Sequence, residues 1–146
     1  MNYKKIRLFL FKRNIAIFKE DGWNFKIFPD PYRKIKTTFN LEISSFLLFL
    51  LNKTKIHPNL VTYFGIFWVY LGVFCFYLNN LFSIFMGLII FFTKLIPDYI
   101  DGALAFLKKK QSSKGHYLDL FAGNINKLGF VIGSLIYIYF STNNIS

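Results

Sequence analysis

After a mixed first segment, the apolar residues of the chain are gathered into three long stretches. Residues 60–78 carry no charged side chain, residues 81–97 carry one, and residues 128–140, extended back to Leu118, form the third stretch. A helix needs about twenty predominantly apolar residues to cross the hydrocarbon core of a bilayer. The pattern therefore predicts three tilted transmembrane helices.

The segment before these stretches predicts helices at the membrane surface rather than across it. Residues 1–38 interleave Lys and Arg with Phe, Ile, Tyr and Trp and contain no apolar run of spanning length. A secretory signal peptide is not expected, because charges such as Lys12 and Arg13 interrupt the apolar core that such a peptide needs. Residues 43–51 (ISSFLLFLL) are apolar but short, which suits a helix lying in the interface.

The composition places the chain among membrane proteins. Hydrophobic residues make up 54% of the 146 residues, and 20 residues are phenylalanine, which is more apolar surface than a soluble domain of this size buries. Cys75 is the single cysteine, so no disulfide forms within the chain. We therefore expect an all-α integral membrane protein with an N-terminal interfacial helix and about three transmembrane helices. The expected regions are a basic amphipathic segment at 1–38, a membrane domain at 39–140 and a polar tail at 141–146.

The net charge of +11 comes largely from Lys and Arg in residues 1–40 and around 108–114. Both groups flank apolar segments, so anionic lipid headgroups are the expected counter-charge and nucleic acid is not an expected partner. The positive-inside rule puts the N-terminus and the 108–114 loop on the cytoplasmic side of the membrane. The uncharged Asn79-Asn80 connection and the C-terminus then lie on the opposite side.

Three carboxylates stand out because they fall between two apolar stretches. Asp98, Asp101 and Asp119 are three of only seven acidic residues in the chain. Burying a carboxylate at a membrane boundary is costly unless a cation compensates its charge, so this group predicts a metal ion or a charged substrate. Asp98 and Asp101 project from one side of a helix, and Gly102 and Gly115 leave room for a group such as a diphosphate near the backbone. Magnesium fits, because it prefers oxygen ligands shared between carboxylates and phosphates.

The spacing of these residues resembles the motif of the CDP-alcohol phosphatidyltransferases, D-x-x-D-G-x-x-A-R, eight residues, then G-x-x-x-D-x-x-x-D. Six of its eight fixed positions match, as Asp98, Asp101, Gly102, Ala105, Gly115 and Asp119. Upstream, the segment 57–62 (HPNLVT) is similar to the Pro-Asn-x-x-Thr entry to the first membrane helix of that family. The resemblance covers residues 36–140.

This resemblance implies transfer of a phosphoalcohol group from a CDP-alcohol, such as CDP-diacylglycerol, to the hydroxyl of an acceptor alcohol, with release of CMP. It implies that Asp98, Asp101 and Asp119 bind one or two divalent metal ions, usually magnesium, with manganese as an alternative. The side chains and backbone positions that it implies for substrate binding are Asn59, Thr62, Gly102, Ala105, Lys114 and Gly115. Lys108 is a further, weaker candidate for a phosphate contact.

Two motif positions depart from the family pattern. Phe106 replaces the arginine that follows the alanine, and Gly123 replaces the last aspartate, to which the family assigns the general base and a metal ligand. Losing a general base typically costs about 10²- to 10⁴-fold in rate. His116 has the chemistry of a base, but its spacing places it on the wrong side of the motif.

The resemblance also implies about six membrane helices, of which this chain shows the front half. Three hypotheses follow. The chain is an enzyme with an altered site, or a catalytically impaired relative that acts as a nucleotide-binding, metal-binding or regulatory membrane subunit, or a truncated fragment. A homodimer or a second subunit that completes the fold is the corresponding partner. The acceptor alcohol is not specified by any residue.

Overall fold

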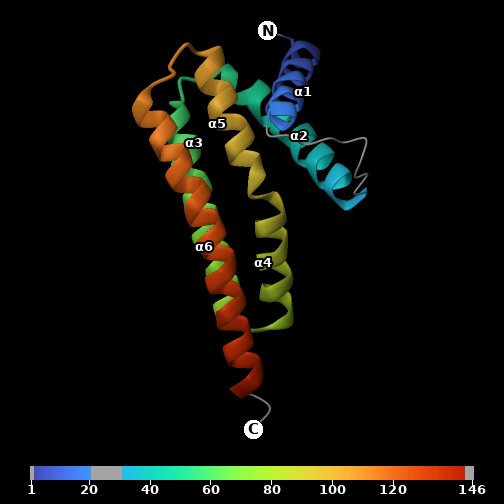
Figure 1. The fold of residues 1–146 in the computed structure, drawn as a ribbon, viewed down its shortest axis with the longest axis vertical. Helices are drawn as coiled ribbons and strands as arrows, with labels where there is room; N and C mark the ends of the chain where they lie inside the picture. Colours follow the sequence, from blue (N-terminus) through green and yellow to red (C-terminus); the bar gives the residue numbers. More distant parts are fainter. Residues whose placement is uncertain (1, 21–30, 144–146) are drawn as a thin grey trace.

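The computed structural model describes residues 2–20 and 31–143, and every regular element in this part of the chain is an α-helix (Figure 1). The predicted all-α class is therefore confirmed. The helices are α1 (Tyr3–Glu20), α2 (Pro31–Asn52), α3 (Pro58–Tyr77), α4 (Leu81–Thr93), α5 (Leu95–Leu107) and α6 (Ser113–Asn143).

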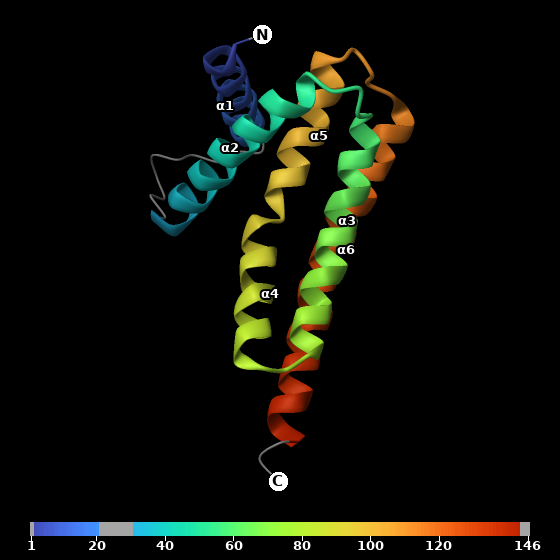
Figure 2. The ribbon, with the colours of Figure 1, turned by 180° about the vertical axis from the view of Figure 1, so that it is seen from behind.

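Three of the described segments are long and apolar enough to cross a membrane, as the sequence predicts: Pro58–Tyr77, Leu81–Leu107 and Ser113–Thr142. They run side by side along the long axis of the molecule, with α3 in contact with α4, α5 and α6 (Figures 1 and 2). The second segment continues past Pro97, where the apolar stretch was expected to end, and the third begins before Leu118. The side of the membrane on which each connection lies stays a prediction.

The second membrane segment is divided at Lys94 into α4 and α5 because of a proline. Pro97 has no N–H group, so it cannot donate the helical hydrogen bond that the carbonyl of Thr93 would accept, and its ring crowds that carbonyl. Within the first turn of α5, however, proline is tolerated, because the N–H groups there have no partner inside the helix. The helix therefore breaks at Thr93 and restarts at Leu95.

Helix α2 is bound to this break by buried polar side chains. Asn40 Nδ2 donates to the carbonyl oxygen of Phe92 at 3.2 Å, and Ser44 Oγ donates to that of Ile96 at 3.4 Å. Both side chains are fully buried, where a hydrogen bond to a carbonyl replaces one to water. The bonds fix α2 across the junction between α4 and α5.

The N-terminal helices lie together at the end of the bundle opposite to the C-terminus (Figures 1 and 2). Ile6 and Leu10 of α1 are fully buried and share one apolar core with α2, α3 and α5, to which Leu48 and Leu104 belong. Arg7 of α1 also forms an exposed ion pair with Glu42 of α2. The first basic segment is thus packed against the second membrane segment, a contact that the sequence pattern did not predict.

Glycines allow the membrane helices to approach closely. A Cβ atom at Gly72 of α3 would lie 2.9 Å from Ile90 Cγ2 of α4, and one at Gly129 of α6 would collide with Val69 of α3. Real Cβ atoms essentially never come this close to a neighbour. Small residues at such contacts are typical of helix packing in membranes, where close van der Waals contact drives association.

We expect Gly129→Ala to destabilise the protein by about 1–3 kcal/mol, since the added methyl group overpacks the contact with Val69. Gly123→Ala is the matched control on the same helix, because a Cβ atom there meets nothing within 4 Å. That control should be neutral or slightly stabilising, as alanine is the better helix former. Thermal unfolding of both variants in detergent tests this. Equal unfolding midpoints would contradict the close packing of α3 on α6.

Candidate active site

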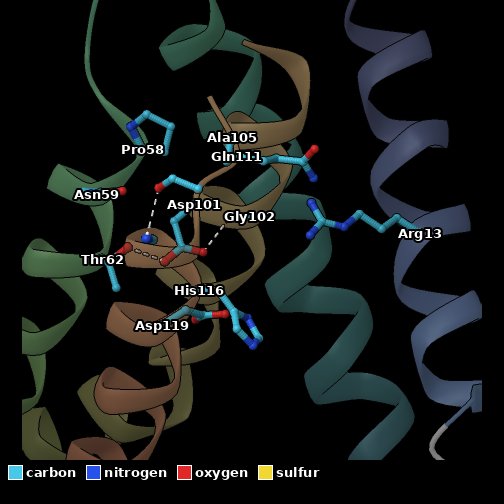
Figure 3. A pocket seen from close by; sticks show the side chains of 12 residues that line it. Arg13, Pro58, Asn59, Thr62, Asp101, Gly102, Ala105, Gln111, His116 and Asp119 are labelled. Atoms are coloured by element: carbon cyan, nitrogen blue, oxygen red, sulfur yellow. Dashed lines mark hydrogen bonds between the residues drawn. The ribbon is translucent and has the colours of Figure 1, made fainter. Parts of the chain in front are cut away.

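A cavity of about 180 Å³ lies where the first turns of α3 and α6 meet the second half of α5, and α1 reaches it from the side (Figure 3). It contains acidic, basic, amide and hydroxyl groups together with two glycines. Its lining residues are Arg13, Pro58, Asn59, Thr62, Asp101, Gly102, Ala105, Gln111, Ser112, Gly115, His116 and Asp119.

The α3 wall is set by the cap of that helix. His57 is the N-cap residue, and its Nδ1 accepts a hydrogen bond from the backbone N–H of Asn59 at 3.3 Å. Pro58 occupies the first turn, where its fixed backbone angle favours helix initiation. Asn59 and Thr62 are three residues apart and therefore share a helix face, which points into the cavity.

The α5 wall carries a buried carboxylate with defined partners. Thr62 Oγ1 donates to Asp101 Oδ2 at 2.6 Å, and the backbone N–H of Gly102 donates to Asp101 Oδ1 (Figure 3). Thr62 and Asp101 are only 4% and 5% exposed. These hydrogen bonds hold Asp101 in one orientation across the α3–α5 contact.

The α6 wall begins at a capped helix terminus. Ser112 Oγ accepts a hydrogen bond from the N–H of Gly115 at 3.1 Å, which is the usual N-cap arrangement. A Cβ atom at Gly115 would lie 3.3 Å from Asn59 Oδ1, so α6 passes close to α3 here. Asp119 follows one turn later and lies across the cavity from Thr62 and Asp101 (Figure 3). The positive ends of the α3 and α6 dipoles thus both adjoin the cavity, which favours anions.

Asp98 departs from the predicted arrangement. It lies on α5 one turn before Asp101 and is not among the residues that line the cavity. Asp119 is near enough to Asp98 and to Asp101 for their charges to repel one another, and Lys94 offsets the charge of Asp98. Within residues 2–20 and 31–143, no three potential ligand side chains are close enough together to hold a metal ion. Joint binding of a metal ion by Asp98, Asp101 and Asp119 therefore stays a prediction.

The two lysines that were candidates for phosphate contacts lie elsewhere. Lys108 Nζ donates to the backbone carbonyls of Thr54 at 2.8 Å and Ile56 at 2.7 Å, so it ties the end of α5 to the connection before α3. Its contact is with the backbone of this connection, and Lys108 is not among the lining residues of the cavity. Lys114 is exposed and does not line the cavity either. Its role in substrate binding stays a prediction without support from its position.

Five lining residues were not predicted as site residues; Arg13 and His116 carry ionisable side chains, and the others are Pro58, Gln111 and Ser112. His116, set aside because of its spacing, lines the cavity beside Asp119 (Figure 3). Arg13 comes from α1, and nothing in the sequence distinguishes it from the other basic residues of that segment. Burial lowers the pKa of Arg13 from its usual value, and the charges of Asp101 and Asp119 act in the opposite direction.

Gly123 lies on α6 one turn after Asp119. A Cβ atom built there meets no atom within 4 Å, so the position opens onto free space. Asn126 follows on the same side of the helix and is 5% exposed, and its Oδ1 has no hydrogen-bond partner among the described residues. The turn after Asp119 thus has room for a larger side chain.

Together, the membrane-spanning helices and the carboxylate-containing cavity at one end of them define a helical membrane protein with a polar site next to the bilayer surface. The family model for CDP-alcohol phosphatidyltransferase matches residues 55–145, more than half of the chain. The chain therefore belongs to the CDP-alcohol phosphatidyltransferase family, a family of membrane phosphotransferases in phospholipid synthesis. The matched region begins after α2, so Arg13 lies outside it.

Sequence similarity to a curated protein is limited to part of that protein. The chain is 37% identical over 87 residues to an uncharacterized protein of Aquifex aeolicus (strain VF5). This similarity covers 60% of the chain and 42% of the relative, so the chain spans less than half of the relative's length. No solved structure matches the chain.

Proposed function

We propose that the protein transfers a phosphoalcohol group from a CDP-alcohol, such as CDP-diacylglycerol, to an acceptor alcohol and releases CMP. The observation that carries this proposal is the composition of the cavity. Residues of the upstream segment, Asn59 and Thr62, lie in the same cavity as motif residues such as Asp101, Gly102 and Asp119. These two segments are far apart in the sequence. A ligand bound in the cavity would contact polar residues of both.

The size and position of the cavity support a diphosphate as the bound group. A volume of about 180 Å³ is below the ~300–1,000 Å³ typical of pockets that enclose a whole drug-sized ligand. It suits the diphosphate part of a donor whose remaining parts extend outside. Apolar side chains such as Leu60 and Tyr63 of α3 and Leu120 of α6 are exposed nearby, and they would contact the acyl chains of a lipid donor that stays in the bilayer.

The cavity also has the right ligand chemistry for magnesium. This ion is usually held by one or two carboxylates together with phosphate oxygens of the substrate, and manganese accepts the same oxygen ligands. Asp101 and Asp119 supply two such carboxylates within the cavity, and Asp98 lies one turn before Asp101 on α5. When bound there, a divalent ion neutralises negative charge on the diphosphate and on the departing CMP.

In the proposed reaction, the hydroxyl oxygen of the acceptor forms a bond to the phosphorus that carries the lipid alcohol. The bond between this phosphorus and the bridging oxygen breaks, that oxygen leaves with CMP, and the hydroxyl proton must go to a base. Glycine at position 123 cannot accept it. His116 is the cavity side chain with suitable chemistry, and we propose that it takes the proton in this chain.

The test is release of CMP from CDP-diacylglycerol by the purified chain in detergent with magnesium, over a panel of alcohols. We expect slow release that falls by about 10²-fold in His116→Gln, the lower end of the loss for a general base. His57→Asn is the matched control, because the chain has two histidines and asparagine keeps the N-cap of α3. Equal rates of CMP release in His116→Gln and the native chain would show that His116 is not the base.

A binding or regulatory subunit is the second candidate function, and Gly123 favours it. In that case the chain binds CDP-diacylglycerol in a magnesium-dependent manner and releases no CMP, with or without an aspartate at position 123. A homodimer or a further subunit that completes the acceptor site belongs to either proposal. Absence of both binding and release would reject the two functions together.

A further inference from the structure

We propose that Arg13 of α1 binds the diphosphate of the donor, so that the N-terminal helix forms one wall of the active site. The identity of this ligand rests on the proposed function. The position of the unpartnered guanidinium nitrogen in the cavity is an observation of the structure.

Among the described residues that line the cavity, Arg13 is the one lysine or arginine. Its side chain extends from α1 toward Gly102 and Gln111 (Figure 3). A Cβ atom at Gly102 would lie 2.7 Å from Arg13 Nη2, so the absence of a side chain at this position leaves space for the guanidinium. The guanidinium group is planar and presents several N–H donors in the geometry that phosphate oxygens accept.

Part of the guanidinium is buried without a hydrogen bond, although the charges of Asp101 and Asp119 act on it. Arg13 Nη1 is buried and has no hydrogen-bond partner, and Arg13 forms no ion pair with a carboxylate in the described part of the chain. Leaving a buried charged donor unpaired is unfavourable, and a bound anion removes this penalty. By contrast, Arg7 on the same helix is exposed and paired with Glu42.

The packing of α1 fixes where Arg13 lies. Phe9 stacks on Phe106 of α5 with ring centroids 5.4 Å apart, and Arg13 follows Phe9 by one turn on the same face of α1. Leu10, between them in sequence, is fully buried in the core. Phe106 occupies the position at which the family pattern has arginine, and it lies one turn after Gly102 on α5. The structure thus brings a cation from α1 next to the segment whose own motif cation is missing.

The experiment measures binding of two probes to the full chain in detergent with magnesium: CDP-diacylglycerol and inorganic diphosphate. We expect Arg13→Gln to weaken the binding of both by about tenfold or more, the effect of losing a charged hydrogen bond. Arg13→Lys should restore part of the affinity, because lysine keeps the charge but not the planar donor geometry. Arg7→Gln is the matched control and should bind both probes as the native chain does.

The unfolding midpoint of each variant separates binding from a structural role. Burial disfavours the charge of Arg13 more than the charges of Asp101 and Asp119 favour it, so Arg13→Gln should unfold at the same temperature as the native chain or at a higher one. A midpoint lowered in Arg13→Gln and not in Arg7→Gln would show that Arg13 is structural and would overturn the proposal.

The two probes also separate this proposal from the proposed function. If the native chain binds CDP-diacylglycerol and Arg13→Gln binds it equally well, Arg13 is excluded while the function stands. If only inorganic diphosphate binds, and does so through Arg13, the anion site is supported and the CDP-alcohol donor is rejected. Failure of the native chain to bind either probe overturns both proposals.

Discussion

Gly123→Asp is expected to raise the rate of CMP release by about 10²- to 10⁴-fold, the contribution of a well-placed general base. The aspartate would lie one turn after Asp119, at the position where the family pattern has its last carboxylate. The structure has room for it, since a Cβ atom at residue 123 meets nothing within 4 Å. Initial rates of CMP formation from CDP-diacylglycerol, with saturating magnesium and acceptor, measure the effect.

Gly123→Asn is the matched control for this substitution. Asparagine has nearly the same size and helix propensity as aspartate but cannot accept the proton, so it should leave the rate close to that of the native chain. A similar gain in both variants would indicate that filling the space, rather than the base, changes the rate. No gain in Gly123→Asp would indicate that the missing carboxylate is not what limits turnover.

Asp101→Asn is expected to lower CMP release by about 10²- to 10³-fold, the usual loss when one group that stabilises charge in the reaction is removed. Because activity of the native chain is expected to be slow, the rate is best measured in the Gly123→Asp background. In the native background, the same substitution should remove magnesium-dependent binding of CDP-diacylglycerol. The fold should persist, because the amide oxygen of asparagine can still accept the hydrogen bond from Thr62 Oγ1, although its amide nitrogen cannot accept the one from the N–H of Gly102.

Asp98→Asn is the comparison variant for Asp101→Asn. Asp98 is one turn from Asp101 on the same helix but does not line the cavity, so its substitution should cost less than that of Asp101. An equal loss in both variants would place Asp98 in the site with Asp101 and Asp119, as the motif alone implies. No loss in Asp101→Asn would exclude the cavity as the reaction site.

Local sequence patterns were sufficient to predict the membrane helices and many residues of the candidate site. The three long apolar stretches predicted the membrane segments, because only a helix satisfies its backbone hydrogen bonds within itself while crossing a bilayer. The spacing of the motif identified residues such as Asp101, Gly102 and Asp119, which the structure brings into one cavity with Asn59 and Thr62. These positions are recognisable because their residue types and spacing resemble the family motif.

The remaining features depend on contacts between distant segments. Arg13 and His116 line the cavity, Lys108 donates to carbonyls of the connection before α3, and Asp98 is not among the lining residues. None of these follows from periodicity, which gives the face of a helix but not the neighbour that covers it. The neighbour is chosen by close packing, here the stack of Phe9 on Phe106 and the contact of Gly129 with Val69. The sequence by itself thus determines the helices and the motif carboxylates, and the packing of α1 onto α5 determines which cation meets them.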